Sequence, residues 1–226
     1  MRHIDRLDEP KILAAKHEEW QKKFNEARKK NPSVRPDAKK YGDDKIREAL
    51  MGCSYGKCFY CESSLKGESS EIDHFVEVSV KPQLAYTWTN LYLSCHNCND
   101  KKSPIKIPAE DVLDPCIDSD QEIQSHIYFE KECIVSQSGS DKGLKTIQKF
   151  KLNSDFLDLK RGKWLRKIWE QAGMIMKQMI VDGRKETTEE ERNQLLRYMQ
   201  ADQPYSLMSK IYIKENFAHL LGGSVI

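Results

Sequence analysis

Helical periodicity of apolar residues marks the first part of the chain. In residues 10–30, Trp20 and Phe24 lie about one helical turn apart among charged residues, which is the pattern of an amphipathic helix. The Asp-Asp pair at residues 43–44 is placed to cap a second, shorter helix, because an Asp side chain accepts hydrogen bonds from the first N–H groups of a helix. We therefore predict a helical segment over residues 1–52.

A longer helical pattern lies near the other end of the chain. The Asn-Ser pair at residues 153–154 is a good N-cap for a helix over residues 156–181. The apolar residues that this pattern predicts to be buried are Phe156, Leu159, Trp164, Ile168, Trp169, Ala172, Ile175, Met176 and Met179. Thr187 and Thr188 each precede a Glu by three residues, the spacing of a capping box, and predict a further helix. Residues 143–226 are thus expected to be a helical region.

Between these helical parts the periodicity disappears. Residues 53–107 are rich in Cys, Gly, Ser and His, the composition of a small module in which metal ligation replaces a large apolar core. Residues 108–142 form an acidic connector with one predicted strand at residues 127–129. The predicted fold is α+β and mainly α-helical, with a small zinc-stabilised module embedded between N-terminal and C-terminal helices.

Charge is unevenly distributed, although the net charge of the 226 residues is only +2. Residues 11–40 hold ten Lys and Arg against four Asp and Glu, and residues 145–185 hold eleven against four. Residues 108–142 reverse this balance, with nine acidic residues against two basic ones. The basic stretches suit a polyanion such as nucleic acid, and they equally suit the solvated faces of ordinary helices.

The composition indicates a cytoplasmic protein without membrane contact. Hydrophobic residues make up 38% of the chain and charged residues 32%, and no apolar run comes near the ~18 residues of a membrane span. Residues 1–6 lack the apolar stretch of a secretory signal. Seven cysteines, four of them in two CxxC pairs, favour metal ligation in a reducing compartment over a disulfide framework.

The two CxxC pairs predict a structural zinc site. Each CxxC turn directs two sulfurs at one ion, and two such turns usually hold Zn²⁺ in a tetrahedron of four thiolates. The predicted ligands are Cys58, Cys61, Cys95 and Cys98. Cys53 is an alternative ligand at a less suitable turn, and Cys116 and Cys133 are expected to be buried, inert thiols. A redox CxxC is disfavoured, because the βαβ context of such motifs is missing from the pattern.

The segment between and just after these pairs carries the residues of a candidate active site. In chain order they are Asp73-His74, Asn90-Leu91 and Asn99-Asp100-Lys101-Lys102. Together with the CxxC pairs, this order resembles the HNH, or ββα-metal, nucleases, in which such segments converge on one divalent ion. The resemblance makes His74 the first H, Asn90 the N and Asn99 the last position, an HNN variant. It implies a ββα-metal module and an endonuclease that hydrolyses phosphodiester bonds of DNA.

The assigned residues have chemistry that suits this reaction. His74, with an ordinary pKa of about 6.5, can accept a proton from the attacking water near neutral pH. Asp73 and the amide oxygen of Asn99 are hard donors for a catalytic Mg²⁺ or Mn²⁺. Asn90 is expected to anchor the loop that carries His74 rather than to touch the phosphate. Lys102 lies about one helical turn after Asn99, and Lys101 and Lys102 are expected to contact phosphate oxygens.

Adjacent residues of a regular strand point to opposite faces. Asp73 and His74 could not both reach one ion from a regular strand. We therefore expect a bend or bulge between the two residues. The same residues also fit other interpretations, because a His beside an Asp often forms a surface ion pair. The chain would then be a non-catalytic zinc-knuckle module that binds nucleic acid or protein, and an RNA or tRNA nuclease would share every catalytic residue.

A narrower resemblance covers roughly residues 1–160. Its motifs include Phe59-Tyr60-Cys61-Glu62, Tyr86-Thr87-Trp88-Thr89-Asn90-Leu91, Leu113-Asp114-Pro115 and Gly143-Leu144-Lys145-Thr146-Ile147. They resemble the PtuB family, the HNH nuclease subunits of retron-associated and Septu-type bacterial anti-phage systems. The resemblance implies a PtuA-like ATPase partner of the ABC/SMC-like type and, in retron-associated systems, a reverse transcriptase with its msDNA.

Overall fold

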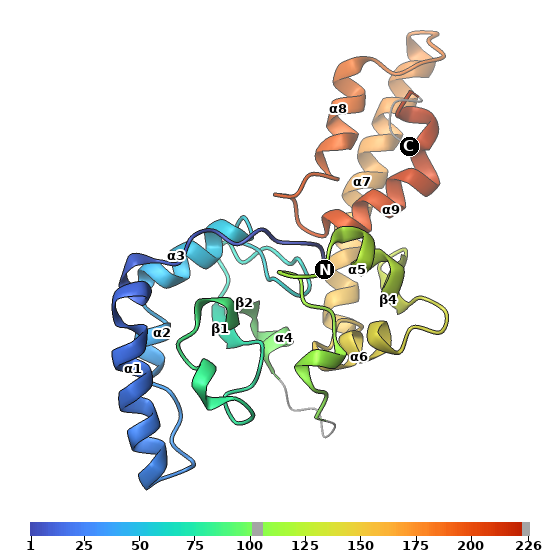
Figure 1. Ribbon diagram of the computed structural model, residues 1–226. Helices are drawn as coiled ribbons and strands as arrows, with labels where there is room; N and C mark the ends of the chain where they lie inside the picture. Colours follow the sequence, from blue (N-terminus) through green and yellow to red (C-terminus); the bar gives the residue numbers. More distant parts are fainter. Residues whose placement is uncertain (101–105, 223–226) are drawn as a thin grey trace.

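The computed structural model describes residues 1–100 and 106–222, which form two lobes (Figure 1). The first lobe contains α1 (Lys11–Lys30), α2 (Ala38–Tyr41), α3 (Asp44–Cys53), β1 (Ser70–His74), β2 (Leu91–Cys95) and α4 (His96–Asn99). Short 3-10 turns η1 (Pro82–Leu84) and η2 (Trp88–Asn90) lie between its strands. The second lobe is a bundle of α7 (Asp155–Val181), α8 (Glu189–Arg197), α9 (Ser206–Phe217) and the turn η4 (Ala218–Leu220).

The two N-terminal helices that the sequence predicts are confirmed as α1 and α3. The Asp43 side chain accepts a hydrogen bond from the Lys45 N–H at 2.9 Å and so caps α3. Trp20 and Phe24 are buried on α1 and meet the ring of Tyr86 edge-on, with ring centroids 5.7 and 6.2 Å apart. This contact holds α1 against the connection between β1 and β2.

The segment between the lobes is more regular than the sequence analysis predicts. The predicted strand is confirmed as β3 (Ile127–Glu130), which pairs antiparallel with β4 (Cys133–Ser136). The helix α5 (Asp120–His126), the turn η3 (Ala109–Asp111) and the strand β4 are missing from the predictions, whereas α6 (Asp141–Lys149) begins two residues before the predicted helical region of residues 143–226. Serine side chains cap both helices, because Ser119 and Ser140 accept hydrogen bonds from N–H groups three residues later.

The long helix α7 buries only part of the predicted face, with Trp164, Met176 and Met179 half-buried against the core. Ile168, Ala172 and Ile175 are buried as expected, but Phe156, Leu159 and Trp169 are 51, 61 and 61% exposed. Apolar residues surround much of this helix, so their spacing alone does not identify the inward face. Its buried residues are Leu157, Arg161, Leu165, Ile168, Ala172 and Ile175, and α7 contacts α8 and α9.

The capping box predicted for the next helix is confirmed at Thr188. Its hydroxyl accepts from the Glu191 N–H, and the Glu191 carboxylate accepts from the Thr188 N–H at 2.7 Å. Thr187 instead donates to the Leu220 carbonyl at 2.8 Å. The capping box sets the start of α8.

The bundle is attached to the first CxxC turn of the other lobe. The Glu62 carboxylate accepts hydrogen bonds from the N–H and hydroxyl of Ser206, at 3.0 and 2.8 Å. The hydroxyls of Ser63 and Tyr205 lie 2.9 Å apart, and the Lys57 ammonium donates to the Gln203 carbonyl at 3.0 Å. These buried polar contacts fix where the bundle joins the lobe that contains β1 and β2.

The fold class predicted from the sequence is confirmed as α+β and mainly α-helical, with small two-stranded sheets. A search of residues 1–100 and 106–222 finds no helix with both the length and the apolar character needed to cross a membrane.

Candidate active site

Four cysteines meet in one buried cluster, as the two CxxC turns predict. The sulfurs of Cys58, Cys61, Cys95 and Cys98 all lie within 4.8 Å of one another. The first turn is joined to the second through β2, because the Phe59 N–H donates to the Leu93 carbonyl at 2.9 Å. Four buried thiols at this spacing are a suitable donor set for a tetrahedral metal ion such as Zn²⁺.

The other three cysteines do not join this cluster. Cys53 is buried, and its sulfur accepts a hydrogen bond from the Leu7 N–H at 3.3 Å. Burial raises the pKa of Cys116 to about 12 despite the nearby Arg6 guanidinium, so this half-buried thiol stays protonated. Cys133 is exposed, contrary to the prediction, because it lies at the start of the hairpin strand β4.

The strand that carries Asp73 and His74 is regular, so the predicted bulge is wrong. β1 pairs antiparallel with β2 in continuous register from Ser70 opposite Cys95 to His74 opposite Leu91. Neighbouring side chains of a regular strand alternate between its faces, and His74 is the last residue of β1. Asp73 accepts a hydrogen bond from Tyr60. Burial, together with the Asp73 charge, raises the pKa of Tyr41, whose ring packs against His74, so both side chains lie near Tyr41.

The imidazole of His74 is held from two sides. Its Nε2 lies 2.8 Å from the Ala85 carbonyl oxygen. Because a carbonyl oxygen only accepts hydrogen bonds, Nε2 carries the proton, and the basic lone pair of the neutral ring is on Nδ1. The ring of Tyr41 packs edge-on against the imidazole, with centroids 4.8 Å apart. These contacts fix both the tautomer and the orientation of the ring.

Asn90 anchors the loop between β1 and β2, as its predicted role requires. Its amide oxygen accepts from the Val76 N–H at 2.8 Å. Its amide nitrogen donates to the carbonyls of Val76 and Leu84, at 3.1 and 3.2 Å. Because Leu84 precedes the residue that bonds His74, the buried Asn90 side chain supports the position of the imidazole indirectly.

Asp73 is a buried carboxylate that accepts a hydrogen bond from Tyr60. The phenol of Tyr60 donates to Oδ2 of Asp73 at 2.8 Å, and both side chains are buried. Burial, together with the negative charge of Asp73, raises the pKa of Tyr60 well above its ordinary value, so the phenol remains a donor. Tyr60 lies between two zinc-ligand candidates, Cys58 and Cys61, and thus connects the cysteine cluster to this carboxylate.

Asn99 has a partner that the sequence analysis missed. Its amide nitrogen donates to one carboxylate oxygen of Glu71. The other carboxylate oxygen of Glu71 accepts a hydrogen bond from Nδ1 of His96 at 2.9 Å. Burial opposes ionisation of Glu71, but these two hydrogen bonds lower its pKa. Because the amide nitrogen of Asn99 is bound to Glu71, its amide oxygen is the atom that remains to act as a metal ligand. The only advance signal was spacing, because Glu71 and Asp73 share one strand face.

The donor chemistry around β1 suits a hard divalent cation. Glu71 and Asp73 share the strand face that interacts with α4 through Asn99, and carboxylate and amide oxygens are the donors that Mg²⁺ and Mn²⁺ prefer. Lys101 and Lys102, which the sequence analysis assigns to nucleic-acid contacts, lie outside the described residues.

Comparison with known proteins supports the same assignment. Residues 58–104 match the family model described as HNH endonuclease. A Septu protein PtuB from Bacillus thuringiensis is 34% identical over 116 residues, which cover 50% of this chain and 43% of that protein. A second Septu protein PtuB, from Bacillus mycoides (strain KBAB4), is 29% identical over 175 residues, or 63% of this chain and 57% of that protein.

The chain spans about half the length of these curated relatives. Its cysteine cluster, its paired strands and the following short helix all fall within the matched segment. Residues 58–104 are therefore similar to an HNH endonuclease domain, in a chain that is similar to the Septu proteins PtuB.

Proposed function

We propose that the chain is a metal-dependent endonuclease that hydrolyses phosphodiester bonds of DNA. The observation that carries this proposal is the orientation of His74 within the HNH domain. Its Nε2 donates to the Ala85 carbonyl, which leaves a basic nitrogen on the other side of the ring. A passive zinc module has no need for an imidazole held in one tautomer by the backbone.

In the proposed reaction, His74 accepts a proton from the water that attacks the phosphorus atom. The bond from phosphorus to the 3′ oxygen of the sugar breaks, and this leaving oxygen takes a proton from solvent water. In the neutral imidazole Nε2 carries the proton, and Nδ1 is the nitrogen that is able to act as this base. The Ala85 carbonyl also stabilises the imidazolium that forms, because it accepts the Nε2–H in both protonation states. Asn90 keeps this carbonyl in place by holding the preceding residue.

Asp73 and the amide oxygen of Asn99 would hold the catalytic Mg²⁺ or Mn²⁺. Such an ion supplies positive charge against the developing charge of the transition state. Tyr60 orients the Asp73 carboxylate through Oδ2, and Glu71 orients the Asn99 amide through its nitrogen. Both supporting contacts are of the kind that sets the direction of a metal ligand. Zn²⁺ in the cysteine cluster would have a structural role.

We further propose that the chain acts in bacterial anti-phage defence, in the cytoplasm. The support is its similarity to Septu proteins PtuB. The family resemblance makes a PtuA-like ATPase the proposed partner, and a retron reverse transcriptase with its msDNA a further one. Residues 1–52, 108–142 and 143–226 would then flank and support the module of residues 53–107. Co-purification with the products of neighbouring genes tests this assignment.

The direct test of the proposed activity is cleavage of supercoiled plasmid DNA with Mg²⁺ or Mn²⁺. The His74→Ala variant is expected to lose cleavage, whereas His219→Ala, which removes an exposed imidazole from the bundle, is expected to keep it. A parallel reaction with RNA tests the alternative substrate. Equal cleavage by both variants would exclude His74 as the base, and cleavage of RNA alone would replace DNA as the substrate.

A further inference from the structure

Tyr41 stands beside two residues that the proposed reaction uses directly. It is the last residue of α2, and its ring packs edge-on against the imidazole of His74, with centroids 4.8 Å apart. Burial raises the pKa of Tyr41, and the negative charge of Asp73 adds to this rise. Because a charge shifts a pKa appreciably only over a short distance, the phenol also lies near the Asp73 carboxylate. Tyr41 is thus close to the proposed base and to a proposed metal ligand.

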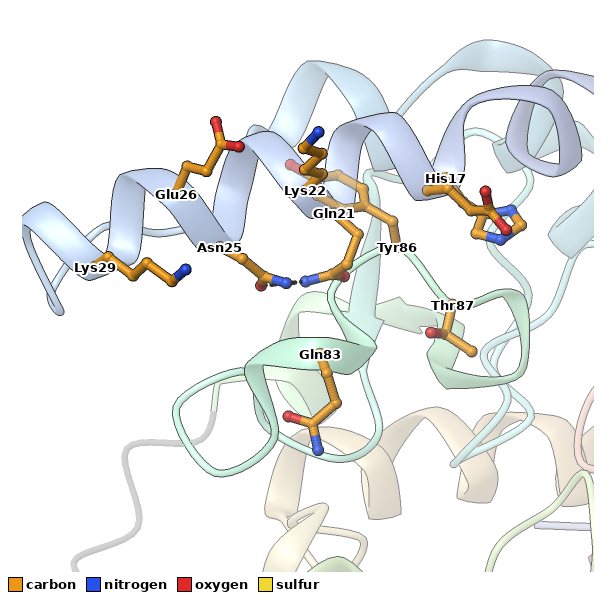
Figure 2. Close-up of a pocket in the computed structure, with 10 residues that line it drawn as sticks. His17, Gln21, Lys22, Asn25, Glu26, Lys29, Gln83, Tyr86 and Thr87 are labelled. Atoms are coloured by element: carbon orange, nitrogen blue, oxygen red, sulfur yellow. Dashed lines mark hydrogen bonds between the residues drawn. The ribbon is translucent and has the colours of Figure 1, made fainter.

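The helix α2 is fixed at this place by the same connection that holds His74. Tyr86 follows Ala85, the residue whose carbonyl accepts the Nε2–H of His74. The Tyr86 side chain lies against α1 (Figure 2), and its hydroxyl accepts a hydrogen bond from the N–H of Asp37 at 2.9 Å. Asp37 is the N-cap of α2. Two consecutive residues of the connection therefore position both the imidazole and the helix that carries Tyr41.

The Tyr41 hydroxyl makes no hydrogen bond to residues 1–100 or 106–222. The side chain is half-buried, but its oxygen is not among the fully enclosed polar atoms that lack a partner. The phenol of Tyr60, by contrast, already donates to Asp73 at 2.8 Å. The O–H of Tyr41 is therefore open to a ligand that lies against His74.

Arg35 adds positive charge on this side of the site. Its side chain is exposed and has no ion-pair partner within the described part of the chain. Its charge lowers the pKa of Tyr41 against the larger effect of burial, so the guanidinium lies near the phenol. Asp37 is near as well, but its carboxylate accepts from the Lys39 N–H at 3.0 Å and lies 4.0 Å from the Lys40 ammonium. The cation is thus open to an anion, whereas the nearby carboxylate is engaged within α2.

A phosphodiester that is attacked by water at His74 would present an acceptor to this phenol. Negative charge grows on the non-bridging oxygens of the phosphate as the attack proceeds. A donor that is already in place stabilises that charge without reorganisation, and it contributes to the rate because it acts most strongly in the transition state. A tyrosine with an ordinary pKa of about 10 keeps its proton at neutral pH, so Tyr41 is a donor there.

Resting on the proposed function, we propose that Tyr41 is a catalytic residue whose hydroxyl donates a hydrogen bond to a non-bridging oxygen of the scissile phosphate. Its ring keeps the imidazole of His74 in place, while its O–H stabilises the charge that develops on the phosphate. Arg35 contributes positive charge from the same side. The alternative, which the experiment separates, is that Tyr41 acts only through its ring.

The test is the rate of cleavage of supercoiled plasmid DNA with Mn²⁺, with kcat and KM determined separately for the parent chain and for Tyr41→Phe. The Phe side chain keeps the ring that packs against His74 and removes only the donor. The kcat of Tyr41→Phe is expected to fall roughly 10–100-fold, the loss that accompanies removal of one hydrogen bond to a charged group. KM is expected to change little, because the hydrogen bond acts mainly in the transition state.

Two further variants show which part of the side chain matters. Tyr41→Leu removes the ring as well, and it is expected to be slower than Tyr41→Phe because the imidazole loses its packing partner. Tyr55→Phe is the matched control, since Tyr55 is a 56% exposed phenol in the turn after α3, and its kcat is expected to equal that of the parent. A kcat of Tyr41→Phe equal to that of the parent, together with slow cleavage by Tyr41→Leu, would overturn the proposal, because the ring alone would then account for the role.

The affinity for Mn²⁺ separates a contact with the phosphate from an effect on the metal. In calorimetry, Tyr41→Phe is expected to bind Mn²⁺ as tightly as the parent, since the phenol that donates to Asp73 is that of Tyr60. A weaker affinity would overturn the proposal, because the Tyr41 hydroxyl would then act through the metal site rather than on the substrate.

The nuclease proposal is tested by the parent chain alone. Cleavage of plasmid DNA by the parent, with an equal kcat for Tyr41→Phe, would show that the Tyr41 inference is wrong and that the nuclease proposal stands. Absence of cleavage by the parent would overturn both proposals.

Discussion

The side chain of Asn90 makes three hydrogen bonds to main-chain groups of one loop, and its removal should be costly. Replacement by Ala leaves the N–H and carbonyl of Val76 and the carbonyl of Leu84 without these partners. The site is 4% exposed, so water replaces the lost contacts poorly. At about 1 kcal/mol net per hydrogen bond, the free energy of unfolding should fall by about 3 kcal/mol.

This loss should appear directly in thermal unfolding followed by calorimetry. For a chain of this size, 1 kcal/mol lowers Tm by roughly 2–4 °C, so Asn90→Ala should melt ~6–12 °C below the parent. Asn216→Ala is the matched control, because the Asn216 side chain is exposed and, within residues 1–100 and 106–222, donates only to the Tyr212 carbonyl of its own helix. Its Tm should stay within about 1 °C of the parent, as surface substitutions usually change stability little.

A second variant separates the lost contacts from the cavity. Asn90→Asp has the same size and keeps the oxygen that accepts from Val76, but it turns a second oxygen toward two carbonyls. It should therefore destabilise at least as much as Asn90→Ala. Plasmid cleavage should also slow in both variants, because the loop holds His74. If both Asn90 variants had the same Tm as Asn216→Ala, the anchoring role of Asn90 would be refuted.

Three further predictions concern the cysteine cluster, the candidate metal ligand Asp73 and the half-buried Asp114. Chelation of zinc, or Cys95→Ser, should abolish the near-UV circular dichroism of the HNH module, because ligation replaces core volume there; an unchanged spectrum would contradict this. Tyr60→Phe should weaken Mn²⁺ binding 10–100-fold in calorimetry at unchanged zinc content, and equal affinity would exclude a role of the Tyr60 hydroxyl in orienting a metal ligand. Burial raises the pKa of Asp114 above its ordinary 3.8, despite a hydrogen bond from Tyr92 that lowers it. The folded protein therefore keeps the Asp114 proton up to a higher pH than the unfolded chain does, so the free energy of unfolding falls as the pH rises from about 4. When urea unfolding is measured at several pH values, Asp114→Asn should remove this decrease.

The features predictable from sequence are those set by nearby residues. The helix α3 begins where Asp43 caps it, and α8 begins where Thr188 and Glu191 form their capping box. The cysteine cluster is equally predictable from the sequence, because two CxxC turns are typical of a shared metal site. In each case the interaction spans a few residues or is imposed by one ion.

The features that escaped prediction depend on contacts between distant segments. The inward face of α7 is chosen by α8 and α9, so Trp169 is exposed although its spacing matches that of buried residues. The contact of Glu71 with Asn99 requires α4 to lie against β1. Nothing in the local pattern distinguishes this Glu from a solvated one, since strand alternation gives only the face it shares with Asp73.

The first CxxC turn does more than contribute two cysteines to the buried cluster. Cys58 and Cys61 place Tyr60 so that its phenol reaches Asp73, and the next residue, Glu62, binds the start of α9 through Ser206. A change at this turn therefore acts on the cysteine cluster, the active-site carboxylate and the attachment of the bundle together. Because Tyr60 is fully buried against the ring of Phe150, with centroids 3.9 Å apart, it cannot shift without disturbing all three. In this fold the first CxxC turn thus supports the Asp73 carboxylate of the candidate active site as well as the cysteine cluster.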